Sequence, residues 1–218
     1  MDHAFRNGLI LDGTRDMKIQ KGLCILVHDG IIADIVPDTA DLDLSGYDVI
    51  DLHGRYILPG LINMHVHLAG NGKPQKKQRD NEKLVKNIMS TSLTRAIAYR
   101  MVAGFAKDEL LSGVTTIRTV GGLGDFDTRL RDEIKAGAKI GPRILASNQG
   151  ISVPGGHMAG SVAVAASSIP DALSHLKKSE QQKVDLIKLM ITGGVLDAKE
   201  KGVPGELKMP PEMVRAVC

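Results

Sequence analysis

Apolar runs of strand length alternate with longer helix-like patterns through most of the chain, and this alternation constrains the fold more than any other feature. Two of the runs end in a Gly-Gly pair, which is typical of a tight turn out of a strand. Strands separated by single helices pair in parallel, because the crossover helix returns the chain to the starting end of the sheet. The expected strands are residues 57–68, 114–120, 143–147 and 185–192, and the expected helices are residues 81–111, 125–136, 170–182 and 211–217.

The first 55 residues follow a different rhythm of short strands and turns. Residues 21–27 and 31–36 are expected to form a hairpin, since Asp29-Gly30 between two apolar runs is a strong hairpin signal. With one more strand at residues 48–52, this β layer is too small to bury both of its faces alone. The rest of the chain favours either a four-stranded open sheet or the first half of a barrel, because a complete (β/α)8 barrel takes roughly 250 residues.

Composition argues against several classes of protein. The net charge is +3 and aromatic residues make up 3% of the chain, which does not favour a nucleic-acid or membrane partner. No apolar stretch approaches the roughly 18 residues of a membrane span, and the first residues lack the apolar segment of a secretory signal. Cys24 and Cys218 make no disulfide framework, so we expect a reduced, cytoplasmic protein.

The pair His65-Val66-His67 closes the first strand of the alternating region. Residues two apart on a strand project to the same side, so the two imidazoles are expected to point together. Imidazole is a common zinc ligand, and the carboxyl ends of barrel strands are where active sites lie. An arbitrary His-x-His pair is more often structural or exposed, and the surrounding sequence decides between these interpretations.

Three motifs in order along the chain resemble the amidohydrolase superfamily. GRYILPGLINMHVH (residues 54–67) is similar to its metal-site signature, with Asn63 where Asp is usual. SGVTTIR (residues 112–118) resembles a second strand of the superfamily, with Thr119 where Asp is frequent, so no role of that carboxylate carries over. DLIKLMITGGV (residues 185–195) resembles the branch that contains Xaa-Pro dipeptidase-like, arginine carboxypeptidase-like and imidazolonepropionase-like enzymes.

The resemblance implies an α/β fold in two parts. Residues 1–55 would form part of a small β-sandwich domain, and residues 56–218 the first four βα units of a metal-binding (β/α)8 TIM-type barrel. It also implies a metal-dependent hydrolase in which a metal-activated water cleaves an amide or cyclic-amide C–N bond. The expected cofactor is Zn²⁺, as two ions, and the expected substrate is a small molecule or a dipeptide. Members often form homo-oligomers.

Lys188 is a candidate site residue both from its setting in the sequence and from the family resemblance. It shares an expected strand face with Met190 and Thr192, and an unpaired buried ammonium is costly, so we expect its pKa to be lowered. A neutral amine can take up CO₂ to form a carbamate, and in the resembling branch this lysine bridges two metal ions. The resemblance therefore implies metal ligands at His65, His67 and Lys188. The alternative is a lysine that extends to solvent at the strand end.

His157 lies in a Gly-Gly-His loop after the third strand, and the family carries a similar loop. The resemblance implies a contact with the substrate, and an ordinary surface histidine is the alternative. The basic residues 73–79 are expected in a solvated loop, with a lid over the site as the minority interpretation. The remaining histidines are expected to be structural or exposed: His3, His28, His53 and His175.

The resembling enzymes complete their site with two more histidines and an aspartate on later strands, and we find no counterparts here. We therefore expect the amino-terminal half of a longer barrel. The alternative function is a noncatalytic half-barrel fragment or a subunit that needs a complementary chain. A third class, an open α/β sheet that binds a cofactor, would need a phosphate loop. Gly121-Gly122-Leu123-Gly124 does not supply one, because the third glycine of the fingerprint falls on Asp127.

Overall fold

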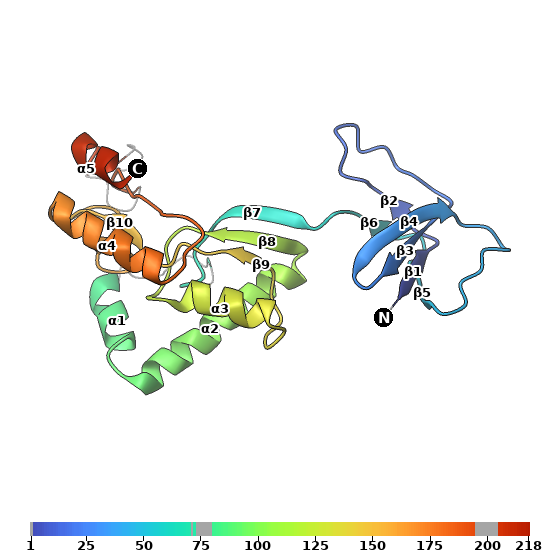
Figure 1. The fold of residues 1–218 in the computed structure, drawn as a ribbon, viewed down its shortest axis with the longest axis horizontal. Helices are drawn as coiled ribbons and strands as arrows, with labels where there is room; N and C mark the ends of the chain where they lie inside the picture. The colour runs from blue at the N-terminus through green and yellow to red at the C-terminus, as the bar shows by residue number, and fades with distance from the viewer. Residues whose placement is uncertain (1, 71, 73–79, 195–204) are drawn as a thin grey trace. The chain divides into compact units, whose positions relative to one another are not determined.

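A computed structural model describes residues 2–70, 72, 80–194 and 205–218 (Figure 1). The chain divides into two compact units, Met1–Gly60 and Leu61–Cys218. From the sequence we expect this division after residue 55. Strand β6 (Tyr56–Ile57) pairs in parallel with β2 (Leu9–Ile10), and this pairing keeps β6 in the smaller unit.

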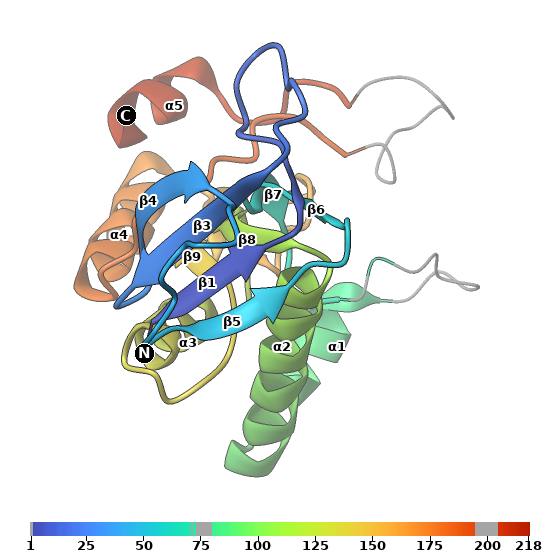
Figure 2. The same ribbon diagram turned by 90° about the vertical axis from the view of Figure 1, so that its right-hand side faces the viewer.

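The smaller unit is built on a four-stranded sheet of order β4-β3-β1-β5, seen face-on in Figure 2. The expected hairpin is present between β3 and β4, with Asp29 and Gly30 at φ 48° and 77°. Two consecutive positive φ values match the right-handed twist of the strands. Strand β1 pairs antiparallel with β3 and parallel with β5. The strands are β1 (His3–Arg6), β3 (Leu23–His28), β4 (Ile31–Pro37) and β5 (Asp48–Asp51).

The larger unit contains a parallel sheet of order β7-β8-β9, as the alternation of strands and helices predicts. Helices α2 and α3 pack against one face of it (Figure 1). Ile117 and Ile144 point into this layer and are buried with Val102, Phe126 and Leu130. The elements are β7 (Leu61–Val66), β8 (Val114–Thr119), β9 (Arg143–Leu145), α2 (Ser92–Leu111) and α3 (Phe126–Lys135).

Strand β7 lies at the edge of this sheet. The sequence predicts a buried strand here, but Leu61, Ile62 and Met64 are 54%, 64% and 45% exposed. The prediction of burial is wrong for the described structure, because only Val66 and Leu68 of this run belong to the buried core among the described residues.

The helix expected over residues 81–111 is two helices, α1 (Asn81–Ile88) and α2. Thr91 ends the break between them, since its side chain accepts a hydrogen bond from the Thr94 backbone N–H as an N-cap. The Ser90 hydroxyl donates to the carbonyl of Asn87. The run Ser90-Thr91-Ser92 therefore contains the N-cap that divides the two helices, although the apolar periodicity continues across it.

The strand expected over residues 185–192 forms only isolated bridges, Ile151 with Leu189 and Thr192 with Leu207. Its pairing partner is β10 (Gly150–Ser152), which lies in a loop that we expected to be irregular and also pairs with β11 (Ala163–Ala165). A second cluster of buried apolar residues packs these strands against the last two helices, including Ile151, Met209 and Met213. The helices are α4 (Ile169–Gln181) and α5 (Pro211–Val217).

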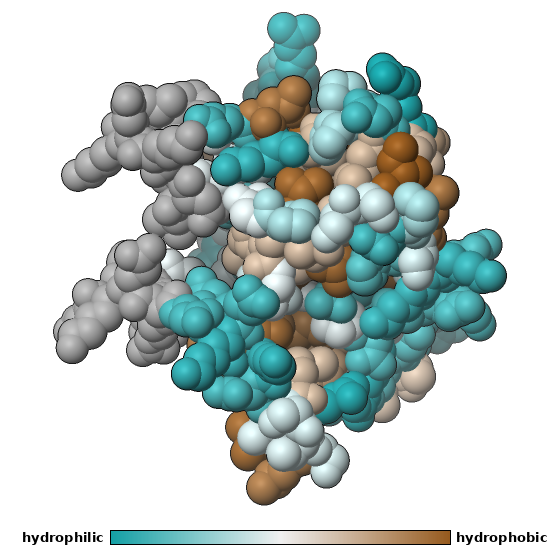
Figure 3. All heavy atoms as spheres, turned by 90° about the vertical axis from the view of Figure 1, so that its left-hand side faces the viewer, coloured by the Kyte–Doolittle hydropathy of each residue, from teal (hydrophilic) through white to brown (hydrophobic). Residues whose placement is uncertain are grey.

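Figure 3 shows the face of the larger unit that carries α1, α4 and α5, where hydrophobic side chains are interspersed among hydrophilic ones. No helix in the described parts of the chain is long and apolar enough to cross a membrane.

A buried polar network lies where β8 and β9 end. The Asn148 side chain accepts a hydrogen bond from the Thr128 backbone N–H at 3.0 Å and donates to the Thr128 hydroxyl and to Gln182. Asp127 is buried beside it, and burial raises its pKa to about 6, although bonds from the Thr119 hydroxyl and the Asn148 backbone N–H oppose the shift. Within the described residues, no donor reaches Asp127 Oδ2.

We predict that Asp127→Asn stabilises the fold at pH 7.5. The raised pKa means that the charged form is disfavoured in the folded state, so the cost of Asp127 grows between about pH 4 and pH 6 and is full above that range. The variant removes this cost and should gain up to about 3 kcal/mol in the free energy of unfolding at pH 7.5 and little at pH 4. Urea unfolding at both pH values measures it, with Asp108→Asn, an exposed aspartate on α2, as the control. An equal effect at both pH values would contradict the interpretation.

Candidate metal centre

His65 and His67 lie at the carboxyl end of β7, and their rings meet edge to face with centroids 5.3 Å apart. The expectation that the pair projects together is consistent with this contact. His65 is exposed and His67 is half-buried. The Asn63 side chain accepts a hydrogen bond from the His65 backbone N–H at 3.2 Å, so a residue of the same motif occupies this donor.

The His67 ring is held from the neighbouring strand. Its Nδ1 lies 3.0 Å from the carbonyl oxygen of Gly121, in the turn after β8. A carbonyl oxygen only accepts, so Nδ1 is the protonated nitrogen of the neutral ring. The lone pair of Nε2 is then available to a ligand, which is the form of imidazole that binds metal ions.

Lys188 is fixed through its backbone and through Asp185. The Ile151 backbone N–H donates to the Lys188 carbonyl at 2.8 Å. Asp185, three residues earlier, accepts hydrogen bonds of 2.8 Å from the Ala146 backbone N–H and from Arg131. The lysine is half-buried, not enclosed among apolar side chains as the strand pattern predicted. The reason is that residues 185–192 form an extended segment and not a central strand.

His157 is half-buried in the loop between β10 and β11, against the Gly-Gly pair that follows residue 192. A Cβ built on Gly194 would overlap its imidazole. Gly194 therefore leaves the space that the His157 ring occupies, and the two family-like motifs meet at this point.

Several neighbouring side chains change the pKa of His65. Partial burial lowers its pKa first, and the positive charges of Lys188, His67, Arg118 and His157 lower it further. All four groups therefore lie near enough to act on one imidazole. A lowered pKa keeps His65 neutral at physiological pH, and the neutral ring is the metal ligand.

Arg118 is the residue of this cluster to which sequence reasoning gave no role. It is half-buried on β8, and its Nε donates to the Met64 carbonyl at 2.8 Å. The second motif contains Arg118, and its alternation with buried Ile117 and Thr119 is the signal that could have placed it on the histidine side of the sheet. Thr119, which replaces an expected Asp, is fully buried on the helix-covered side.

A hollow of about 650 Å³ borders both histidines of the pair. Its walls are mainly apolar and come from the end of β7, from α1 and α2 and from the loop after β10. A mainly apolar hollow with a few polar groups is typical of a small-molecule site. Representative lining residues are His65, His67, Leu68, Val85, Phe105 and Met158.

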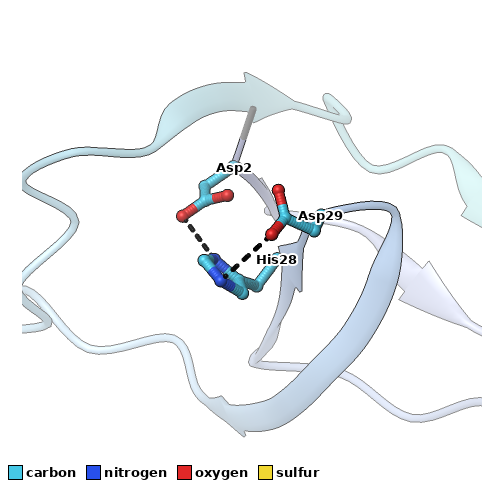
Figure 4. Close-up of side chains that lie close together, drawn as sticks. All are labelled: Asp2, His28 and Asp29. Atoms are coloured by element: carbon cyan, nitrogen blue, oxygen red, sulfur yellow. Dashed lines mark hydrogen bonds and ion pairs between the residues drawn. The ribbon is translucent and has the colours of Figure 1, made fainter.

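Another group of donors lies in the smaller unit, where Asp2, His28 and Asp29 have donor atoms within 4.8 Å of one another (Figure 4). It is the one such set of three His, Cys, Asp or Glu residues among those described, so His65, His67 and His157 do not form one. His28 Nδ1 is 2.7 Å from Asp2 and Nε2 is 3.5 Å from Asp29. The hydrogen bond to Asp2 raises the pKa of His28, which favours the cation that cannot bind a metal.

The other histidines are consistent with structural roles. His3 lies 3.3 Å from Asp48 and His53 lies 3.4 Å from Asp51, both in the smaller unit. His175 is on α4, where burial lowers its pKa. The basic run of residues 73–79 lies outside the described residues.

The amidohydrolase family model matches residues 56–217, and the chain belongs to this family. The resemblance of the three motifs is therefore confirmed. Members of the family generally bind metal ions.

Relatives with known names include an imidazolonepropionase from Salmonella paratyphi A. It is 34% identical over 114 residues, which cover 46% of this chain and 28% of that protein. A Bifidobacterium longum structure assigned as a prolidase is 31% identical with a TM-score of 0.74, and the chain covers 46% of it. An Xaa-Pro dipeptidase solved with methionine in its active site is 28% identical with a TM-score of 0.74, and the chain covers 53% of it.

All of this chain aligns with the two solved structures. The chain spans about half the length of those proteins, and its match spans about a quarter of the imidazolonepropionase. The family comparison thus supports the α/β fold and an amino-terminal portion of a larger architecture.

We predict that Lys188→Met raises the pKa of His65 toward the ordinary value of about 6.5. Removal of the ammonium makes protonation of the nearby imidazole easier, because Lys188 is the largest charge that opposes it. A proton NMR titration of the ring measures the change. Lys177→Met, on α4 and not among the charges that act on His65, is the matched control. An unchanged His65 pKa would place Lys188 away from the pair.

Proposed function

We propose that the chain belongs to a metal-dependent hydrolase that cleaves an amide or cyclic-amide C–N bond. The observation that carries the proposal is the edge-to-face contact of His65 and His67 at the carboxyl end of β7, with His67 Nδ1 bonded to the Gly121 carbonyl. The positive charges of Lys188 and His157 also act on His65. With Arg118, the charged groups that act on His65 come from the end of β7, from β8, from a loop and from an extended segment, and such a cluster of titratable groups is typical of a functional site.

The residues present fit a divalent metal ion, and we propose Zn²⁺, as two ions in the complete site. His67 has its Nε2 lone pair free of the Gly121 bond, and His65 has a lowered pKa. Zinc prefers imidazole nitrogen and anionic oxygen ligands. A metal ion bound there would lower the pKa of water and polarise a substrate carbonyl.

Lys188 would supply the anionic oxygens. Its neutral Nζ adds to the carbon of CO₂ and loses one proton, which gives a carbamate with two oxygens and one negative charge. The charge on Lys188 would then change from positive to negative, so its repulsion of a cation at His65 would become attraction. The half-burial of Lys188 and the hydrogen bond from Ile151 to its carbonyl, which holds its backbone, support this role.

His157 would contact the substrate from the loop between β10 and β11. Gly194 leaves room for its ring, and its neighbour Met158 lines the hollow, which has space for a small molecule or a dipeptide-like amide. We propose such a substrate, no nucleic-acid or membrane partner and a homo-oligomer. The names of two relatives, an Xaa-Pro dipeptidase and an imidazolonepropionase, support an acyclic or a cyclic amide respectively.

The exposed edge of β7 favours a second candidate, a noncatalytic subunit whose site needs a complementary chain. Leu61 and Ile62 are more than half exposed there, and an unpaired apolar edge strand tends to pair with another strand. The two candidates differ in whether the chain hydrolyses amides by itself.

We predict that the chain binds Zn²⁺ more tightly in bicarbonate than in bicarbonate-free buffer. Competition with a chelating dye measures the affinity, and elemental analysis of protein purified without chelators measures the metal content. His67→Gln should lower the affinity in both buffers by at least about 10-fold, because it removes a direct ligand. Lys188→Met should remove the bicarbonate dependence and leave the residual binding by the histidines.

His175→Gln, which changes a histidine on α4, is the matched control and should bind like the wild type. Assays against N-acyl amino acids, Xaa-Pro dipeptides and cyclic amides then separate the two candidates. Zn²⁺ binding without hydrolysis favours the subunit, whereas the absence of Zn²⁺ binding overturns both the metal assignment and the hydrolase proposal.

A further inference from the structure

We infer that Ser147 is a positioning residue for His67 and acts through the backbone of Gly121. The effect of Ser147 on metal binding rests on the proposed function, whereas the positioning of His67 by hydrogen bonds is independent of it. The residues involved come from the ends of three neighbouring strands, β7, β8 and β9, and none of them other than His67 is a proposed ligand.

The connection is continuous in the structure. The Gly121 backbone N–H donates to the Ser147 hydroxyl oxygen at 2.9 Å, and the Gly121 carbonyl lies 3.0 Å from His67 Nδ1. Just before this residue, the Val120 backbone N–H donates to the Val66 carbonyl at 3.1 Å. Gly121 is therefore held by Ser147 on one side and bonds to the imidazole on the other.

The direction of each hydrogen bond is determined by chemistry. The Ser147 hydroxyl donates its single proton to the Asn148 carbonyl at 3.1 Å, so toward Gly121 it is an acceptor. The Ser147 backbone N–H donates to the Thr119 hydroxyl at 3.1 Å, which fixes the residue in place. Ser147 is 1% exposed, so water does not substitute for these partners.

Only glycine, which lacks a Cβ, fits at position 121. Its φ is 132°, a backbone conformation that residues with a Cβ rarely adopt. A Cβ there would lie 3.2 Å from the Val162 carbonyl and 3.3 Å from His67 Cε1. Because the backbone conformation is fixed and the imidazole packs directly on it, the carbonyl is aimed at Nδ1 and Nε2 is left as the ligand atom.

A second buried serine, Ser152, serves as a comparison because it makes no such bond to the backbone of Gly121. Ser152 on β10 is 0% exposed, and its hydroxyl has no partner among the described residues. Ser147 and Ser152 thus share residue type, burial and proximity in sequence, but only Ser147 is bonded to Gly121.

The test is the tautomer of His67 in the metal-free chain. Two-bond proton–nitrogen NMR spectra of the ¹⁵N-labelled protein, recorded at alkaline pH where imidazole is neutral, show which ring nitrogen carries the proton. His67→Gln identifies the signals of this ring by their loss. We expect the Nδ1–H form in the wild type and in Ser152→Ala.

Ser147→Ala should give a mixture of the two tautomers, because Gly121 loses its acceptor and the carbonyl is released. Ser147→Cys fills nearly the same space with a poor acceptor and should give the same mixture, which separates the hydrogen bond from the loss of volume. Circular dichroism verifies that each variant is folded. If Ser147→Ala does not fold, the comparison of the His67 tautomer between Ser147→Cys and the wild type tests the inference.

The second measurement is Zn²⁺ affinity by dye competition. Both Ser147 variants should bind about 10–100-fold more weakly than the wild type and Ser152→Ala. An Nε2–H tautomer in the wild type, or an unchanged tautomer in both Ser147 variants, overturns the inference. If the wild type shows the Nδ1–H form but binds no Zn²⁺, the proposed function fails and the positioning role of Ser147 stands.

Discussion

The parallel pairing of β7 with β8 is the interaction on which the candidate centre depends. The pairing continues past both strands through the hydrogen bond from Val120 to Val66, so the turn after β8 lies directly beside the end of β7. Burial of Ile117 beneath α2 and α3 fixes which face of β8 points to the helices. Arg118 is then directed to the opposite face, and the carbonyl of Gly121 meets the ring of His67.

Local patterns predicted the elements whose partners are close in sequence. The β3–β4 hairpin follows from Asp29-Gly30, and the strand at β8 follows from its β-branched residues. The side-by-side projection of His65 and His67 follows from the period of a strand, since it needs no knowledge of the neighbours. The strand period could therefore predict that the pair points together, whereas the ligand roles of the pair and of Lys188 came from the resemblance of the motifs.

Features that depend on distant partners were missed or misjudged. The apolar run of residues 185–192 satisfies a strand pattern, but β10 pairs with only part of it, and β10 lies in a glycine-rich loop without a strand signal. Half-burial of Lys188 follows from that pairing. The contact between Ser147 and Gly121 joins the ends of two strands that α3 separates, and a serine after an apolar run gives no sign of the N–H that will donate to it.

The polar network behind the histidine pair explains why buried carboxylate and hydroxyl groups are tolerated there. Asn148 bonds to both of these buried groups. Its backbone N–H donates to the Asp127 carboxylate, and its carbonyl accepts the proton of the Ser147 hydroxyl. Its side chain is in turn satisfied by Thr128 and Gln182. One residue, Asn148, thus bonds both to a destabilising carboxylate and to the serine that we propose as a positioning residue. The stability lost at Asp127 and the orientation of a ligand at His67 therefore belong to one continuous set of hydrogen bonds.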